Sequence, residues 1–202
     1  LANCASVFSY MSQQMNTFLT PFFLMNILLI SKSDSGFIML ATPLSMMLLS
    51  PVGGRMADKY GSRRPSAIGL AIIIFGCVLM SLLKESSTVY YVIGALICFG
   101  IGNGLSVSAI NTAIFSAVPK EHSGVASGMV ATMRNLGQGL GVAFGGAIIA
   151  MRERAYLAKL AAGSGNEAYL LAQRDAFYFG ICIVIISLTC MLLTPNARKK
   201  KS

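Results

Sequence analysis

The sequence predicts an all-α polytopic membrane protein with six transmembrane helices, from its composition and the spacing of its apolar runs. Of its 202 residues 55% are hydrophobic and only 11% are charged, and the mean hydropathy is +0.69. A soluble domain carries about 25% charged residues, so this chain has too few polar side chains to cover a water-soluble globule. The net charge of +9 comes from cations in short segments between the apolar runs and in the tail. Such clusters are the orientation signal of membrane proteins, and they argue against nucleic acid as a partner.

The first apolar run, about residues 5–30, is long enough to cross a bilayer core, which takes about 20 residues of helix. It contains the amides of Gln13, Gln14 and Asn16. An amide in the middle of a membrane costs free energy unless it faces a cavity or bonds to a partner helix. Both interpretations stay open for this cluster.

The second span, about 36–52, ends at the polar segment 53–65, and the third span follows at about 66–83. The third span is apolar on every face, which is typical of a helix that faces lipid. The fourth span, about 89–118, has a glycine-rich middle with Asn103, and Asn111 follows two turns later. A dinucleotide-binding loop would need a preceding strand and a full GxGxxG spacing. The glycines therefore predict close helix packing instead.

The fifth span, about 124–151, carries Gly137, Gly141 and Gly145 at four-residue spacing. This repeat allows two helix backbones to approach closely. The same span contains Arg134, the one ionisable residue well inside any predicted span. Arg134 either binds an anionic group or a carboxylate, or it reaches toward the end of the helix and bonds to carbonyl groups there.

The segment 152–175 is expected to lie on the extracytoplasmic membrane surface as two short amphipathic pieces, before a sixth, wholly apolar span at about 176–194. A basic tail, 198–201, closes the chain. The side of the membrane that holds segment 53–65 and this tail is richer in lysine and arginine. It should be cytoplasmic, together with both ends of the chain.

Polar groups are unevenly spread over the six spans. The first, fourth and fifth contain most of them, the second is intermediate, and the third and sixth have almost none. Three or four helices should therefore line a wet cavity, with two outside them. The residues expected to line this cavity or bind a substrate are Gln13, Gln14, Asn16, Asn103, Asn111 and Arg134.

The segment 53–65 contains a recognisable motif. It matches the pattern G-x-x-x-D-[RK]-x-G-x-[RK]-[RK] at Gly54, Asp58, Lys59, Gly61, Arg63 and Arg64. This resembles the cytoplasmic signature loop of the major facilitator superfamily, which lies between the second and third helices of a six-helix half. The glycine-rich start of the fifth span, 124–137, is similar to the penultimate helix of the fourteen-helix drug:proton antiporter branch.

The resemblance implies one half of a major-facilitator-type fold, in which the first, second, fourth and fifth helices line the central cavity. It also implies a secondary active transporter that exports amphipathic organic compounds or drugs by alternating access, driven by protons. Family members have twelve or more helices, so residues 1–202 would be the C-terminal half, and Leu1 in place of Met favours a fragment. The expected partners are the lipid bilayer, a small organic substrate and a missing N-terminal half of six or more helices.

The motif has a physical rationale of its own. Asp58, at the end of the second span, can accept hydrogen bonds from the N-terminus of a neighbouring helix, or it can pair with Arg63 or Arg64. Gly54 would allow close helix approach, and Gly61 a tight turn. Contacts that form in one arrangement of the helices and break in another would make this motif a conformational latch.

Enzyme chemistry is not indicated. There is no HExxH, no CxxC, and no cluster with metal-ligand spacing, so we expect no catalytic residue, metal or cofactor. No aspartate or glutamate lies inside a predicted span. A proton carrier would then belong to the missing half or to the substrate. The alternative function is a truncated membrane half that does not transport and acts as an assembly or interaction partner.

Overall fold

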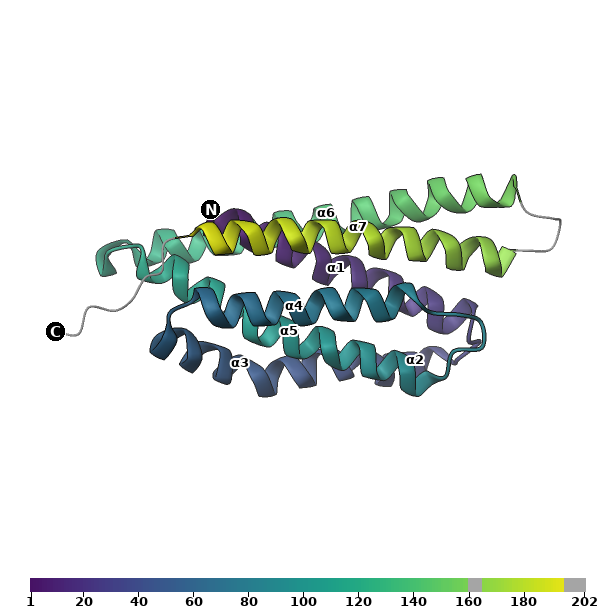
Figure 1. Ribbon diagram of the computed structural model, residues 1–202, viewed down its shortest axis with the longest axis horizontal. Helices are drawn as coiled ribbons and strands as arrows, with labels where there is room; N and C mark the ends of the chain where they lie inside the picture. The colour runs from purple at the N-terminus through teal and green to yellow at the C-terminus, as the bar shows by residue number, and fades with distance from the viewer. Residues whose placement is uncertain (160–164, 195–202) are drawn as a thin grey trace.

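The computed structural model describes residues 1–159 and 165–194. These residues form α-helices joined by short connections and contain no strand (Figure 1). The helices are α1 (Ala2–Asn26), α2 (Lys32–Met39), α3 (Ala41–Tyr60), α4 (Arg63–Ser81), α5 (Val89–Ser116), α6 (Ser123–Leu157) and α7 (Gly165–Leu193), with a 3₁₀-helix η1 (Lys120–His122) before α6.

Helices α2 and α3 together form one membrane-length segment with a break at Leu40. Pro43 explains the break, because it has no N–H to donate to the carbonyl of Met39 and its ring crowds that carbonyl. In the described part of the chain, four segments are long and apolar enough to cross a membrane: α2–α3, α4, α5 and α7. The more polar α1 and α6 complete a bundle of six membrane-length helices, which confirms the predicted fold class.

The polar segment 53–65 is mostly helical, so the expected loop is wrong. Helix α3 continues to Tyr60 and α4 starts at Arg63, which leaves only Gly61 and Ser62 between them. Hydropathy marks where the apolar residues stop, but a helix can continue into water, since its backbone hydrogen bonds are internal.

The segment 152–175 does not form two short separate pieces, because the helices on either side extend into it. Helix α6 runs on to Leu157, and α7 already begins at Gly165. The two extensions are tied together at Asp175. Its carboxylate pairs with Arg152 at 3.1 Å and accepts a hydrogen bond from the Tyr156 hydroxyl at 2.8 Å.

Smaller differences concern the ends of the first two spans. Helix α1 stops at Asn26, and α2 already begins at Lys32, between the predicted spans of about 5–30 and 36–52. The Ser31 hydroxyl accepts a hydrogen bond from the backbone N–H of Asp34 and so caps α2. The predicted basic tail 198–201 lies outside the described residues.

The ends of the helices fall into two groups. The N-terminus, the α3–α4 turn and the α5–α6 connection lie at one end of the bundle, called here the Asp58 end (Figure 1). The α1–α2 and α4–α5 connections, the end of α6 and the start of α7 lie at the opposite end.

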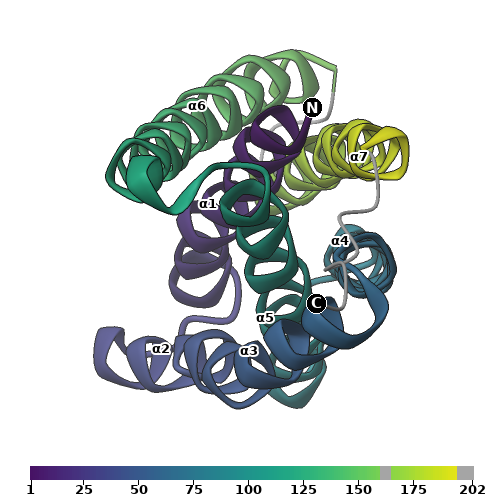
Figure 2. The same cartoon turned by 90° about the vertical axis from the view of Figure 1, so that its left-hand side faces the viewer.

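Viewed along the bundle, α1 and α5 are central, α6 and α3 lie at its two extremes, and α4 and α7 lie together on one side (Figure 2). The core between α1, α4, α5 and α7 contains Phe23, Leu70, Phe99 and Phe177, all fully buried. Helix α3, by contrast, buries only Gly53 and Ala57. The two extreme helices therefore present unpaired faces.

Helix α6 is held on α1 by the predicted glycine repeat. A Cβ atom built on Gly137 would lie 3.0 Å from Tyr10 Cβ, and one on Gly145 would lie 2.9 Å from Met15 Cγ. A Cβ on Gly141 would collide with the backbone carbonyl of Met11. The two backbones are in contact along this line, and no larger residue fits between them.

We expect Gly141→Leu to destabilise the bundle by about 1–3 kcal/mol, because the rigid α1 backbone cannot move away from the new side chain. The measurement is thermal unfolding of the full-length protein in detergent. Gly139→Leu is the matched control, since nothing lies within 4 Å of a Cβ there. Equal melting temperatures for the two variants would contradict the contact.

Candidate functional site

Two of the cavities lie among the helices that were expected to line a wet space. One, of about 340 Å³, lies between α1 and α3. The other, of about 370 Å³, lies between α3 and α5 toward the Asp58 end. Both combine apolar walls with a few amide, hydroxyl or carboxylate groups, as small-molecule cavities do.

The α1–α3 cavity brings together two of the three amides predicted on α1. Gln13 and Asn16 line it, with Thr17, Thr42 and Met46. Gln13 Nε2 makes a weak contact with the Met46 sulfur at 3.8 Å. This arrangement favours the cavity interpretation for Gln13.

Asn16 and Gln14 are more engaged in packing. Asn16 is 2% exposed, and its side-chain oxygen accepts a hydrogen bond from the Thr20 hydroxyl at 3.1 Å. The Cβ of Gln14 lies 3.0 Å from a Cβ built on Gly141, so Gln14 lies against α6. The cluster therefore divides between the two interpretations.

The two asparagines of α5 also differ. Asn103 is fully buried, and its Nδ2 donates to the carbonyl of Phe99 at 2.8 Å. The expectation that Asn103 faces a cavity is wrong in this conformation, because helix α5 is covered at that level. Asn111, two turns later, lines the α3–α5 cavity. The Oδ1 atoms of both asparagines are buried without a hydrogen-bond partner among the described residues.

Asp58 lines the same cavity as Asn111. The hydroxyls of Ser108 and Thr112 donate to carbonyl groups of their own helix at 2.6 and 3.0 Å. They therefore present lone pairs to the cavity. No hydrogen bond joins the Asp58 carboxylate to this wall in the described part of the chain.

Neither expected partner of Asp58 is found in this half. Among the described residues the one ion pair is Arg152–Asp175, so Asp58 is paired with neither Arg63 nor Arg64. All three side chains are exposed. No hydrogen bond joins Asp58 to a helix N-terminus within the described part of the chain. A latch contact at Asp58 would need a donor from outside this half.

The turn that follows Asp58 depends on Gly61. Gly61 has φ 83° and ψ 156°, a region that is essentially restricted to glycine. It lets α4 start after only one more residue. Lys59, just before the turn, places its ammonium 5.2 Å from the centre of the Tyr60 ring.

Close helix approach near the motif falls on Gly53, not on Gly54. A Cβ built on Gly53 would collide with Ser108 and would lie 2.8 Å from the carbonyl oxygen of Gly104. Nothing in the described chain lies within 4 Å of a Cβ built on Gly54. The expected role of Gly54 is therefore wrong within this half. Spacing alone cannot decide between two adjacent glycines. They lie on different faces of the same helix, and only the packed structure shows which face meets another helix.

Arg134 is exposed on α6 and forms no ion pair with any described residue. One turn further along, α6 crosses Tyr10 at Gly137. Tyr10 is buried at this crossing, with 6% of its surface exposed.

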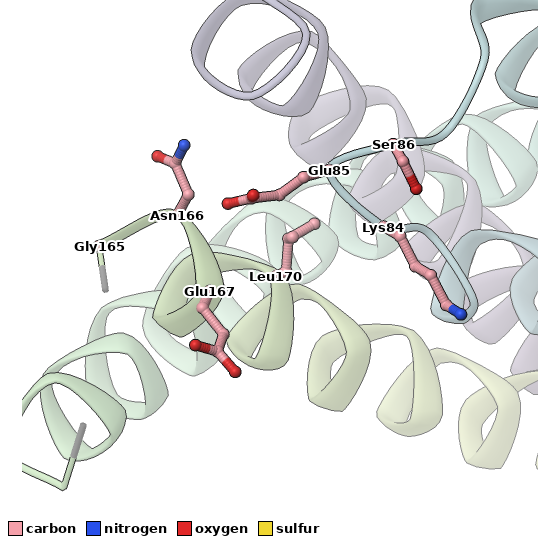
Figure 3. Close-up of a pocket in the computed structure, with 7 residues that line it drawn as sticks. All are labelled: Lys84, Glu85, Ser86, Gly165, Asn166, Glu167 and Leu170. Atoms are coloured by element: carbon pink, nitrogen blue, oxygen red, sulfur yellow. The ribbon is translucent and has the colours of Figure 1, made fainter. Parts of the chain in front are cut away.

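The opposite end of the bundle has an open cavity of about 800 Å³ between the α4–α5 connection and the start of α7 (Figure 3). Glu85 and Glu167 line it, and Lys84 points away from both carboxylates. In the described part of the chain no group of three or more histidine, cysteine, aspartate or glutamate side chains could hold a metal ion.

Six packed helices, a tight basic turn between the second and third spans, and cavities among the more polar helices are typical of half of a membrane transport protein. The family can be named from the sequence. The sequence model of the protein family described as Major Facilitator Superfamily matches residues 2–202. The chain therefore belongs to this family.

Curated relatives include transporters of different kinds. The riboflavin transporter RibZ of Clostridioides difficile is 31% identical over 93% of this chain and 41% of RibZ. The multidrug resistance protein Stp of Mycobacterium tuberculosis is 30% identical over 65% of this chain and 24% of Stp. The quinolone resistance protein NorB of Staphylococcus aureus is 32% identical over 60% of this chain and 27% of NorB. The chain thus spans less than half the length of these relatives.

Solved structures show the same fold. A structure of the proton-dependent oligopeptide transporters matches with a TM-score of 0.75 and 16% identity, over 100% of this chain and 41% of that chain. The E. coli fucose:proton symporter FucP matches with a TM-score of 0.72 and 18% identity, over 96% of this chain and 48% of FucP. At these identities the likeness concerns the fold alone.

We expect Gly61→Ala to lower the free energy of unfolding by about 1–3 kcal/mol, because alanine is strained at a positive φ with extended ψ. Thermal unfolding of the full-length protein in detergent is the measurement. Gly54→Ala, in an open helical position of the same motif, should be neutral or stabilise by up to about 1 kcal/mol. A Gly54 variant as unstable as the Gly61 variant would contradict this reading of the turn.

Proposed function

We propose that this chain is the C-terminal half of a secondary active transporter that exports amphipathic organic compounds or drugs by alternating access, coupled to protons. The cavities between α1, α3 and α5, in which few polar groups stand among apolar walls, carry this proposal. Relatives named for multidrug or quinolone resistance favour export, and the one named for riboflavin favours an organic substrate.

The remaining half of the transporter would pack on α3 and α6. Helix α3 exposes an apolar stripe, and α6 exposes apolar side chains at the other extreme of the bundle. Neither of these exposed faces is covered by another helix in the described part of the chain. Such faces fit a second helical half with lipid around it. The exposed residues include Leu44, Met47, Leu48 and Val52 on α3, and Val125, Leu136 and Phe144 on α6.

The motif residues Gly54, Asp58, Lys59, Gly61, Arg63 and Arg64 would form the latch between two access states. Asp58 has no hydrogen-bond or ion-pair partner among the described residues, so the proposed partner is the N-terminus of a helix in the other half, whose free N–H groups and dipole favour an anion. The contact would hold one state and break in the other. The basic residues around Asp58 favour a cytoplasmic location, in the cell membrane, for this end of the bundle and for both ends of the chain.

Proton coupling requires a titratable group on the transport path. The carboxylates of this half lie toward the helix ends, and the one furthest into a helix, Asp175, is held by Arg152 and Tyr156. We therefore assign the proton carrier to the other half or to the substrate. A guanidinium group does not serve as a proton carrier in proteins, so Arg134 is not assigned this role. It would bind an anionic group of the substrate or a carboxylate of the other half.

Asp58→Asn in the full-length protein should reduce export at least about 10-fold at equal expression, since the neutral amide loses the charge-assisted contacts of the latch. Export of ethidium and of riboflavin from loaded cells is the measurement, with and without a protonophore. Glu121→Gln, an exposed carboxylate at the same end, is the control.

Export that is unchanged in Asp58→Asn would remove the latch, and export that resists the protonophore would remove proton coupling. A full-length protein that moves none of these compounds would favour the non-transporting half.

A further inference from the structure

A fourth cavity, of about 310 Å³, lies between α1, α6 and α7 at the end of the bundle opposite Asp58 (Figure 1). It is separate from the α1–α3 and α3–α5 cavities and contains none of the motif residues. Its lining includes Phe18 and Phe22 from α1, Ile149 and Glu153 from α6, and Tyr169 from α7. The volume is within the usual range for small-molecule sites, about 300–1,000 Å³.

The apolar part of this cavity is aromatic. The rings of Phe18 and Phe22 lie with centroids 5.2 Å apart at 64°, an edge-to-face pair. Gly146 lies beside them, and a Cβ there would already be 3.6 Å from the Phe18 ring. A larger residue at this position would cover the ring, so glycine leaves an aromatic surface open to a ligand.

The polar part is a carboxylate without a cation. Glu153 is partly buried, and no lysine or arginine is among the residues that line the cavity. The neighbouring Arg152 is engaged by Asp175, with its Nε 3.1 Å from the carboxylate. In the described chain, therefore, Asp175 has both a cation and a hydrogen-bond donor, whereas Glu153 has no ion pair.

Tyr169 adds a second unsatisfied group to the same cavity. Its hydroxyl oxygen is buried and has no hydrogen-bond partner among the described residues. A buried hydroxyl without a partner costs free energy, about 1–3 kcal/mol. A ligand with N–H donors would satisfy this oxygen and neutralise Glu153 at once.

We propose that this cavity binds the ammonium group of an amphiphilic organic amine. The ammonium would donate to the Glu153 carboxylate and to the Tyr169 oxygen, and the apolar body would lie on Phe18, Phe22 and Ile149. A cation beside aromatic rings is favourable in its own right. A metal ion fits less well, because the polar side chains of the lining, one carboxylate, one phenol and the Asn26 amide, supply too few ligands. A transport role for the bound amine rests on the proposed function, whereas binding itself does not.

The test measures binding of dansylcadaverine, a fluorescent primary amine, to the purified full-length protein in detergent. Its N-acetyl derivative has the same apolar body but no charge. Glu153→Gln should weaken dansylcadaverine binding about 10-fold, the loss of one charge-assisted contact, and leave the acetylated probe unchanged. Phe22→Ala should weaken both probes, because the apolar wall contacts the body they share.

Glu167→Gln is the matched control. Glu167 is a carboxylate in the first turn of α7 at the same end of the bundle, but it lines the neighbouring open cavity (Figure 3). The proposal is overturned if Glu153→Gln binds dansylcadaverine as the unmodified protein does, or if Glu167→Gln weakens binding equally. The thermal unfolding of each variant is measured as well, to show that each one is folded at the temperature of the binding measurement.

The natural amine can come from a lipid headgroup or from a soluble compound. Nanodiscs of phosphatidylcholine and of phosphatidylethanolamine separate these sources. If the lipid amine is the occupant, dansylcadaverine binds more weakly in phosphatidylethanolamine than in phosphatidylcholine. Glu153→Gln should then remove this difference between the two lipids. Equal binding in both identifies a soluble amine. The readout is binding, so a protein that binds the amine but does not export it still supports this proposal. A protein that does not bind the amine at this cavity overturns this proposal but does not contradict the export proposal.

Discussion

Backbone contact through glycine is the constraint on which the rest of this half depends. On one side, Gly137, Gly141 and Gly145 let α6 lie directly on α1, and on the other, Gly53 lets α3 lie on α5. In a membrane there is little hydrophobic force between helices, so such close packing is what fixes their crossing. The crossing in turn fixes which side chains face each other, and the cavities lie between the helices that these contacts position.

The continuous helix α3 changes what its acidic residue can do. In a loop, Asp58 would be free to turn toward Arg63 or Arg64. On a helix that ends only at Tyr60, its backbone position is fixed, and the side chain lines the α3–α5 cavity. A carboxylate placed there has its favourable partner outside this half. The same rigidity makes it a suitable group for a contact that changes between two arrangements of rigid halves.

Carboxylates at the other end show how strongly local pairing decides chemistry. Asp175 and Glu153 lie on adjacent helices, but Arg152 and Tyr156 satisfy only Asp175. Glu153 is left with a phenol and two aromatic rings. The first carboxylate ties α6 to α7, and the second is available to a ligand.

The sequence by itself determined the fold class, the number of spans and the glycine repeat on the fifth span, because apolar length and small-residue spacing are properties of each helix alone. Only the tertiary structure decided that α3 and α6 extend past their apolar runs, since a helix keeps its hydrogen bonds on entering water. It alone separated buried Asn103 from cavity-lining Asn111, assigned close approach to Gly53 in place of Gly54, and placed Glu153 beside Tyr169. These outcomes depend on which face of one helix meets another far away in the chain, and no local pattern records that.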